Sequence, residues 1–132
     1  MLEMFSLKGR VAIVTGGASG FGRATSKLFA EAGAVVVLAS RRADKLEIVA
    51  DEIAAMGGHA LVVATDVTIE AQVKNLVEQS LERFGQIDVL VNNAGILTRT
   101  PVPETSEEEW YALMDANLKG PFLCCKHVLP SC

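Results

Sequence analysis

Residues 11–22 read VAIVTGGASGFG, an apolar segment that runs directly into a glycine-rich turn. Residues 11–14 are apolar and mostly β-branched, which is typical of a strand covered on both faces of a parallel sheet. Gly16, Gly20 and Gly22 follow at the spacing G-x-x-x-G-x-G, and an amphipathic helical pattern begins after them. This order of strand, turn and helix indicates the first βαβ unit of an α/β protein.

The turn formed by Gly16, Ser19, Gly20, Phe21 and Gly22 has the features of a dinucleotide-binding turn. A backbone without side chains can approach a pyrophosphate closely, and the free N–H groups at a helix start carry partial positive charge. The flanking strand and helix favour this interpretation over a purely structural turn. A Walker-type site is excluded, because no Gly-Lys-Ser/Thr follows the glycines.

Three more apolar runs, at residues 35–39, 61–64 and 89–91, alternate with helical patterns in units of roughly 30 residues. We therefore expect an α/β fold, a doubly wound, Rossmann-like parallel sheet with strand order 3-2-1-4, in one domain over residues 1–132. The predicted apolar helix faces are Phe21, Ala24, Leu28, Phe29 and Ala32; Leu46, Val49, Ala50 and Ile53; Val73, Leu76, Val77, Ser80, Leu81 and Phe84; and Trp110, Leu113, Met114 and Leu118.

The second predicted strand leads into Ser40, Arg41 and Arg42. Many dinucleotide sites place an acidic side chain here to bind the ribose 2′-hydroxyl, and such a carboxylate would repel a 2′-phosphate. A small hydroxyl followed by two guanidinium groups instead offers room, a hydrogen bond and charge-assisted pairing. This pattern favours NADP(H) over NAD(H). The alternative is that the arginines form an ordinary solvated entry to the next helix.

Further motifs follow in a fixed order. Asp66 comes after the third apolar run, residues 92–95 (NNAG) follow the fourth, and Asn117 lies in the fourth helical pattern. Together with Thr15 and the glycine turn, this order and spacing resemble the N-terminal, cofactor-binding half of the short-chain dehydrogenase/reductase family.

The resemblance implies roles for these positions. Asn92 would brace the central strands, and Asn117 would belong to the catalytic set. The reaction implied is hydride transfer between NADP(H) and a small alcohol or ketone. The family also implies a homo-oligomer, a dimer or tetramer, formed through the fourth helix. The residues expected beside the adenine and the adenosine ribose are Asp66, Val67, Asn93, Ala94 and Gly95.

Asn117 can also be interpreted physically. Its backbone carbonyl would normally accept from the amide four residues later, but that residue is Pro121, which has no N–H. We expect a kink near Gly120 and a freed carbonyl able to hold a water molecule. A packed kink with a capped carbonyl is the alternative. The fourth helix should begin at Ser106, with Glu109 completing a capping box.

The proton-transfer group expected for such a reaction is absent from this sequence. The family uses a Ser and a Tyr-x-x-x-Lys motif, whereas Tyr111, the only tyrosine, is followed four residues later by Asp115. We expect the C-terminal half of the fold to be missing from the 132-residue chain, and the chain alone to be catalytically inert. The alternative is a non-enzymatic NADP(H)-binding or interaction module.

Composition excludes other classes of protein. Twelve Lys plus Arg against 16 Asp plus Glu give a net charge of −4, which disfavours nucleic acid as a partner. No apolar run approaches the ~18 residues of a membrane span. Cys124, Cys125 and Cys132 suit neither a disulfide framework nor, with His59 and His127, a metal site. We expect a cytoplasmic protein without a metal.

Overall fold

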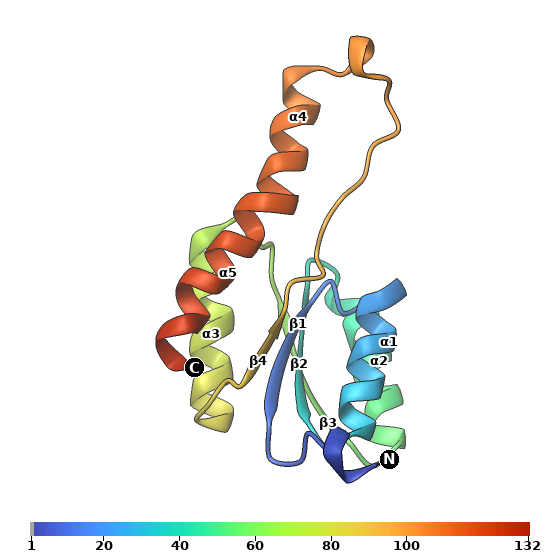
Figure 1. The fold of residues 1–132 in the computed structure, drawn as a ribbon, viewed down its shortest axis with the longest axis vertical. Helices are drawn as coiled ribbons and strands as arrows, with labels where there is room; N and C mark the ends of the chain where they lie inside the picture. Colours follow the sequence, from blue (N-terminus) through green and yellow to red (C-terminus); the bar gives the residue numbers. More distant parts are fainter. Residues whose placement is uncertain (1) are drawn as a thin grey trace.

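The computed structural model describes residues 2–132. A parallel sheet of four strands lies between two layers of helices (Figure 1). The strands follow the order β3-β2-β1-β4, and every neighbouring pair is parallel. The predicted doubly wound, Rossmann-like sheet is therefore confirmed. The strand bounds are β1 Val11–Thr15, β2 Val35–Ser40, β3 His59–Ala64 and β4 Val89–Val91.

Helices α1 and α2 cover one face of the sheet, and α3 and α5 cover the other (Figure 1). The α-helix bounds are α1 Gly20–Glu31, α2 Ala43–Ala55, α3 Glu70–Phe84, α4 Glu107–Met114 and α5 Gly120–Val128. The shorter elements are η1 Glu3–Phe5, η2 Val102–Glu104, the π-helical turn η3 Asp115–Lys119, and η4 Leu129–Ser131.

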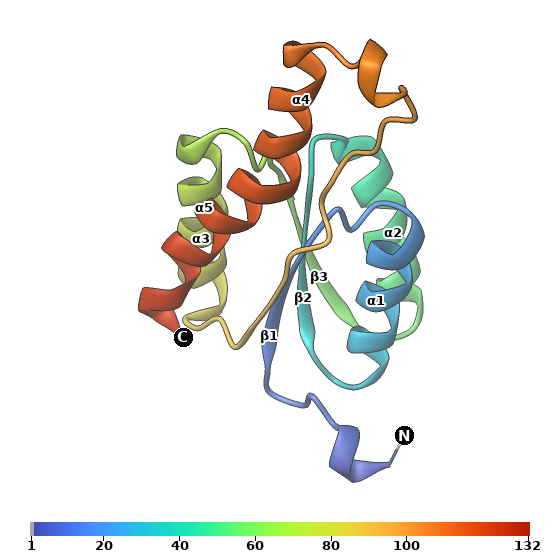
Figure 2. The ribbon, with the colours of Figure 1, turned by 45° about the horizontal axis from the view of Figure 1, so that its top comes forward.

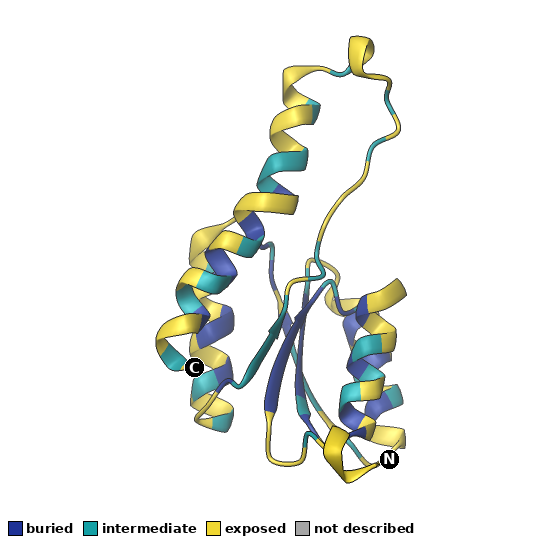
Figure 3. Ribbon diagram, viewed as in Figure 1, coloured by how far each residue is buried: buried dark blue, intermediate teal, exposed yellow. Residues whose placement is uncertain are grey.

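All five residues of β1 are buried, because both faces of this central strand are covered (Figure 3). Ile13 faces the cluster that includes Leu76 of α3, and Val14 faces the cluster that includes Leu46 and Ile53 of α2. The apolar faces predicted for α2 and α3 are confirmed by these two clusters. Alternate residues of one strand thus bind two helix layers to a single sheet.

Of the apolar face predicted for α1, Phe29 packs against the core and Ala32 is buried, but the rest of the prediction is wrong for this helix. Its buried residues are Gly22, Ser26 and Ala30, whereas Phe21 and Leu28 are 87% and 53% exposed. The small side chains let the helix lie close to the sheet, and the Ser26 hydroxyl donates to the Gly22 carbonyl over 2.7 Å. Helix α1 is therefore held mainly by close backbone approach, with Phe29 as the large apolar side chain that packs against the core.

The segment after β4 and the helix α4 extend beyond the carboxyl ends of the strands (Figure 1). The Ser106 hydroxyl accepts from the Glu109 N–H over 3.1 Å, which confirms the predicted helix start. The Glu109 carboxylate accepts instead from the Thr98 hydroxyl, so the predicted reciprocal half of the capping box is not formed. Helix α4 has no buried residue, and Trp110 on its predicted apolar face is 52% exposed.

The predicted disturbance near Pro121 takes the form of the π-helical turn η3, and the chain then continues into α5 (Figure 2). The Gly120 N–H donates to the Asp115 carbonyl five residues back. Pro121 follows η3 without a break in the helix, and it has no N–H to donate to a carbonyl of the preceding turn. Over residues 2–132, no helix is long and apolar enough to cross a membrane.

Candidate functional site

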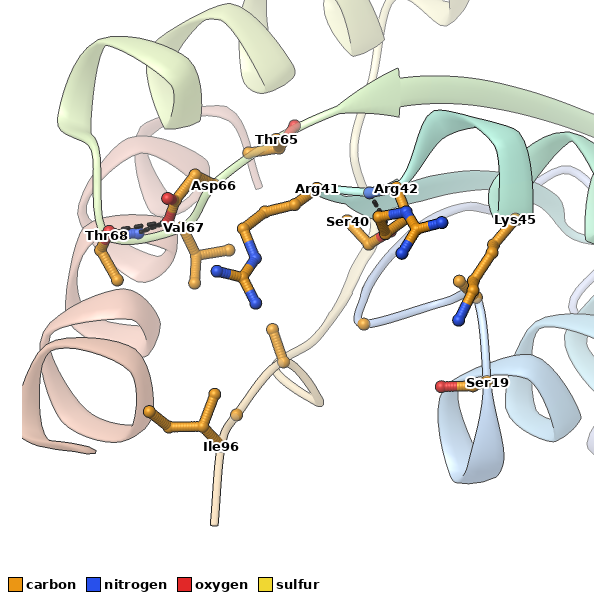
Figure 4. A pocket seen from close by; sticks show the side chains of 14 residues that line it. Ser19, Ser40, Arg41, Arg42, Lys45, Thr65, Asp66, Val67, Thr68 and Ile96 are labelled. Atoms are coloured by element: carbon orange, nitrogen blue, oxygen red, sulfur yellow. Dashed lines mark hydrogen bonds between the residues drawn. The ribbon is translucent and has the colours of Figure 1, made fainter. Parts of the chain in front are cut away.

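A pocket of about 260 Å³ opens at the carboxyl ends of the strands, where parallel α/β sheets bind their ligands (Figure 4). It brings together segments from four parts of the chain, among them the glycine turn and the ends of β2 and β3. Gly20, Phe21, Gly22, Asn93 and Asn117 are predicted site residues that do not line it. The lining residues are Gly16, Ala18, Ser19, Ser40, Arg41, Arg42, Lys45, Thr65, Asp66, Val67, Thr68, Ala94, Gly95 and Ile96.

Thr15 joins the glycine turn to the segment after β4. Its buried hydroxyl donates to the Val91 carbonyl over 3.3 Å and accepts from the N–H groups of Asn93 and Ala94, each over 3.0 Å. One side chain therefore fixes both the end of β1 and the backbone that follows β4.

Asn93 braces the turn from the other side, because its Nδ2 donates to the Gly16 carbonyl over 3.1 Å. The resemblance implied a different role for Asn92, that of bracing the central strands, whereas its side-chain hydrogen bond among the described residues is to α5. The Asn92 side chain is exposed and donates to Cys125 Sγ over 3.5 Å. The bracing residue is the second asparagine of the pair.

The glycines of the turn leave backbone open where side chains would intrude. Gly16 has a φ of +65°, and a Cβ there would lie 2.9 Å from Asn93 Nδ2. A Cβ at Gly22 would collide with the Gly16 carbonyl. Gly20 has a φ of +55°, and a Cβ there would meet nothing within 4 Å. The turn is thus packed against the protein on one side and open on the other.

Helix α1 begins beside the pocket. Ser19 precedes it in an extended conformation, and its hydroxyl makes no capping hydrogen bond among the described residues. The first N–H groups of an α-helix have no acceptor within the helix and carry partial positive charge. The Ser19 hydroxyl and these N–H groups therefore form a set of donors suited to an anion. Phe21 points elsewhere, since it is 87% exposed and does not line the pocket.

The end of β2 supplies the positive charge. The Ser40 hydroxyl accepts from the Arg42 N–H over 3.2 Å. The Arg42 guanidinium pairs with the carboxylate of Asp44, Nε to Oδ1 over 3.2 Å and Nη2 to Oδ2 over 3.1 Å. This pairing lowers the pKa of Asp44. Arg41 forms no ion pair within residues 2–132, and its side chain extends toward Val67 (Figure 4).

Asp66 is held as a carboxylate at the end of β3. Its Oδ1 accepts from the Thr68 hydroxyl over 2.7 Å and from the Thr68 N–H over 3.0 Å. The bond from the hydroxyl is the main cause of its lowered pKa. Val67 also packs against α5, because a Cβ at Gly120 would lie 2.7 Å from Val67 Cγ2. The predicted pair Asp66 and Val67 thus lines the pocket from a fixed position.

Asn117 lies in η3 and contacts the segment after β4. Its Oδ1 accepts from the Ile96 N–H over 2.8 Å, and its Nδ2 donates to the Ile96 carbonyl over 2.9 Å. A Cβ at Gly95 would lie 2.7 Å from the same Oδ1. The side chain therefore acts on the backbone at the pocket rim, a contact that the argument from its carbonyl did not predict.

The pocket-lining residues that were not predicted from the sequence are Ala18, Lys45, Thr65, Thr68 and Ile96. Lys45 had a detectable signal, because it lies three residues after Arg42 and hence on the same side of the first helical turn. Thr65 and Thr68 also had a signal, because they flank Asp66 and Val67 directly after an apolar run that predicts a strand. The backbone position of Ile96 has no signal of its own in the sequence.

Comparison with known proteins identifies the family. The family described as short chain dehydrogenase matches residues 10–132. The chain belongs to the short chain dehydrogenase family. An uncharacterized oxidoreductase of Listeria monocytogenes is 44% identical to this chain over 126 residues, which cover 96% of this chain and 51% of the relative. The chain spans about half the length of the curated relatives it matches.

Solved short chain dehydrogenases have the same fold. The crystal structure of a short-chain type dehydrogenase/reductase from Mycobacterium marinum is 38% identical, with a TM-score of 0.96 over 98% of this chain and 53% of that one. A metagenomic short-chain oxidoreductase in complex with NADP is also 38% identical, with a TM-score of 0.90 over 95% of this chain and 57% of that one.

Several titratable side chains of the chain lie away from the pocket. Tyr111 is 57% exposed on α4, and its ring packs edge-on against Trp110 with centroids 5.3 Å apart. Burial raises the pKa of the Cys124 thiol to about 11, which keeps it protonated. Among the described residues there is no group of three His, Cys, Asp or Glu side chains that could hold a metal ion.

Proposed function

We propose that this short chain dehydrogenase chain binds NADP(H) and forms the cofactor-binding domain of an oxidoreductase. The reaction would be hydride transfer between NADP(H) and an alcohol/carbonyl pair. The observation that carries the proposal is that Arg41, without an ion pair among the described residues, lines the same pocket as Ser40 and the glycine turn. The NADP complex of a 38% identical relative supports it.

The residues present fit a dinucleotide. A Cβ at Gly16 or Gly22 would press into Asn93, whereas the backbone at Gly20 faces open space that a pyrophosphate could approach. The Ser19 hydroxyl and the first N–H groups of α1 would bind the phosphate oxygens, with Gly16, Gly20, Phe21 and Gly22 contributing backbone. The pocket volume of about 260 Å³ suits the adenosine end of such a ligand.

The adenosine end would be bound by three segments. Asp66 and Val67 would contact the adenine, and residues 93–95 would pass beside the ribose. Ser40 and Arg41 would bind a 2′-phosphate, since a hydroxyl and an unpaired guanidinium are suited to a dianion and no carboxylate lies at position 40 to repel it. NADP(H) is therefore favoured over NAD(H).

The bound nicotinamide would supply or accept the hydride. The protein's part is to hold the cofactor and to fix the backbone around it, and Asn117 would act as a positioning residue through its two bonds to Ile96. Within these 132 residues no Tyr-x-x-x-Lys motif is present to move a proton. We infer that the chain by itself binds cofactor without turning over substrate.

We also infer that the exposed apolar face on α4, η3 and α5 contacts a second copy of the chain in a homo-oligomer. Trp110, Leu118 and Phe122 on these elements are 52%, 62% and 60% exposed. Light scattering after size-exclusion chromatography tests this. A wild-type dimer that dissociates in the Leu118→Ser variant is expected, and a monomeric wild type would contradict the inference.

Thermal unfolding with added cofactor tests the binding proposal. A ligand at 100 times its Kd stabilises the folded state by about 2.7 kcal/mol, so NADPH should raise the Tm more than NADH at equal concentration. A larger rise with NADH, or no rise with either, would contradict the proposal. A turnover assay with NADP(H) and simple alcohols or ketones should give no rate above the enzyme-free blank.

A further inference from the structure

The three cations that line the pocket near the start of α2 are not equivalent. Arg42 is already engaged, because both ends of its guanidinium contact the Asp44 carboxylate over 3.1 and 3.2 Å. This hydrogen-bonded pair raises the pKa of Arg42 and lowers that of Asp44. An anion that enters the pocket must compete with Asp44 for Arg42. Arg41 and Lys45 form no ion pair among the described residues. The Asp66 carboxylate attracts Arg41 without forming an ion pair with it, and Lys45 lacks even this neighbour.

Lys45 lies where a lysine is electrostatically unfavourable in the unliganded protein. It occupies the first turn of α2, at the positive end of the helix dipole, close to two arginines in the sequence. It forms no ion pair within residues 2–132, and yet it lines the pocket. A bound anion would relieve this local excess of positive charge.

The side chains of Arg41 and Lys45 extend into different parts of the pocket. Arg41 extends toward Val67 and Ile96, whereas Lys45 extends toward Ser19 and lies near Arg42 and Ser40 (Figure 4). The ammonium therefore lies between the end of β2 and the start of α1. That is the region where a phosphate on the ribose would be placed if the pyrophosphate binds at α1.

We propose that Lys45 is a specificity-determining residue for the 2′-phosphate, and that Asp44 weakens 2′-phosphate binding by holding Arg42. This inference rests on the proposed NADP(H) function. Arg41 and Lys45 then provide the positive charge that is available to the 2′-phosphate without the displacement of an ion pair. Arg42 contributes only to the extent that the phosphate displaces the Asp44 carboxylate. The ion pair is exposed, with side chains 62% and 68% accessible, so displacement is easy and the penalty is moderate.

Isothermal titration calorimetry with two small probes isolates this subsite. Adenosine 2′,5′-bisphosphate carries the 2′-phosphate, and adenosine 5′-monophosphate lacks it. Lys45→Met should weaken binding of the bisphosphate about tenfold, as expected for the loss of one charge-assisted contact, and leave the monophosphate unchanged. Lys45→Arg should restore most of the loss. Asp44→Asn should strengthen binding of the bisphosphate about threefold, a modest effect because the pair is exposed.

Lys74→Met is the matched control, because Lys74 is exposed on α3, forms no ion pair in the described part of the chain and does not line the pocket. It should change neither affinity. Circular dichroism would confirm that each variant folds, which is expected because all these side chains are exposed.

The outcomes separate this inference from the proposed function. If Arg41→Met weakens binding of the bisphosphate while Lys45→Met does not, the inference fails and the NADP(H) proposal stands. Equal weakening of both probes by Lys45→Met would show a general electrostatic effect and would also overturn it. If Asp44→Asn leaves the bisphosphate affinity unchanged or lowers it, Asp44 is not a competitor. A wild-type chain that does not distinguish the two probes would overturn the function and the inference together.

Discussion

The side chain of Asn117 forms two hydrogen bonds with the backbone of a single residue, Ile96, accepting from its N–H over 2.8 Å and donating to its carbonyl over 2.9 Å. The two residues are 21 positions apart, one in η3 and the other in the segment after β4. The Asn117 side-chain amide thus pairs with the Ile96 backbone as a neighbouring strand would, with one hydrogen bond donated and one accepted. It fixes the backbone at the pocket rim to the helical layer.

Asn117→Ala is expected to remove both bonds and to lower the free energy of unfolding by about 1–2 kcal/mol. Hydrogen exchange at the Ile96 amide should accelerate more than exchange in β1. Asn117→Asp keeps an acceptor for the Ile96 N–H but places an oxygen against the Ile96 carbonyl, so it should be no more stable than Asn117→Ala. Unchanged exchange at Ile96 in Asn117→Ala would show that the pairing does not fix this segment.

Thr15→Val should be strongly destabilising although it preserves shape. It removes the acceptor of two N–H groups, those of Asn93 and Ala94, and an unpaired buried N–H costs about 1–3 kcal/mol. Chemical denaturation should show a loss of about 2 kcal/mol or more. Thr15→Ser retains the hydroxyl and is the control. Equal stability of the two variants would mean that the hydroxyl is not the link between β1 and β4.

Gly22→Ala should impair cofactor binding. A Cβ at Gly22 must displace the Gly16 carbonyl and the Asn93 amide, which would deform the turn and cost about 1–3 kcal/mol of stability. Gly85→Ala is the control, because Gly85 has a φ of +76° but open space around it, so only backbone strain of about 1–2 kcal/mol is expected. NADPH affinity should fall in Gly22→Ala and be unchanged in Gly85→Ala. Equal NADPH affinity in both variants would argue against the turn as the binding element.

Asp88 makes the stability depend on pH. Its carboxylate accepts from the Val11 N–H over 2.8 Å, and this bond is the main cause of its lowered pKa. A carboxyl whose pKa is lower in the folded state stabilises fully above its unfolded pKa, and the contribution is lost as pH falls through the folded value. Asp88→Ala should cost about 1–2 kcal/mol at neutral pH.

The difference between Asp88→Ala and the wild type should shrink below about pH 4, where the unfolded carboxyl begins to protonate. Urea denaturation at a series of pH values measures it. A difference that stays constant into strong acid would show that the charge of Asp88 contributes nothing.

The strands could be predicted from the sequence. A short β-branched run such as residues 35–39, preceded by a glycine turn, is typical of a buried strand and too short for a helix. The packing of helix α1 could not be predicted, since it uses Gly22, Ser26 and Ala30, and small residues carry little weight in a hydrophobic pattern. Phe21 and Leu28 dominated that pattern but point away from the sheet. The close approach of the α1 backbone to the sheet depends on tertiary packing, and it leaves no periodic hydrophobic pattern in the sequence.

Residues that line the pocket could be predicted where a residue type is tied to a local backbone position, as at Gly16, Ser40 and Asp66. The site was not predicted where a partner had to be chosen. Asn92 and Asn93 are identical in type and adjacent, and the backbone turn after β4 decides which of them reaches Gly16. Lys45 was overlooked because a lysine in a charged first turn has the pattern of an ordinary solvated helix face.

The central claim is that the pocket selects for a 2′-phosphate, and the most direct measurement is the ratio of the Kd for NADH to the Kd for NADPH. Calorimetric titration of the 132-residue chain at low ionic strength gives both values. Because a charge-assisted contact contributes about 1.5–3 kcal/mol, the ratio should be about ten or more. A ratio of one, or a preference for NADH, would contradict the account.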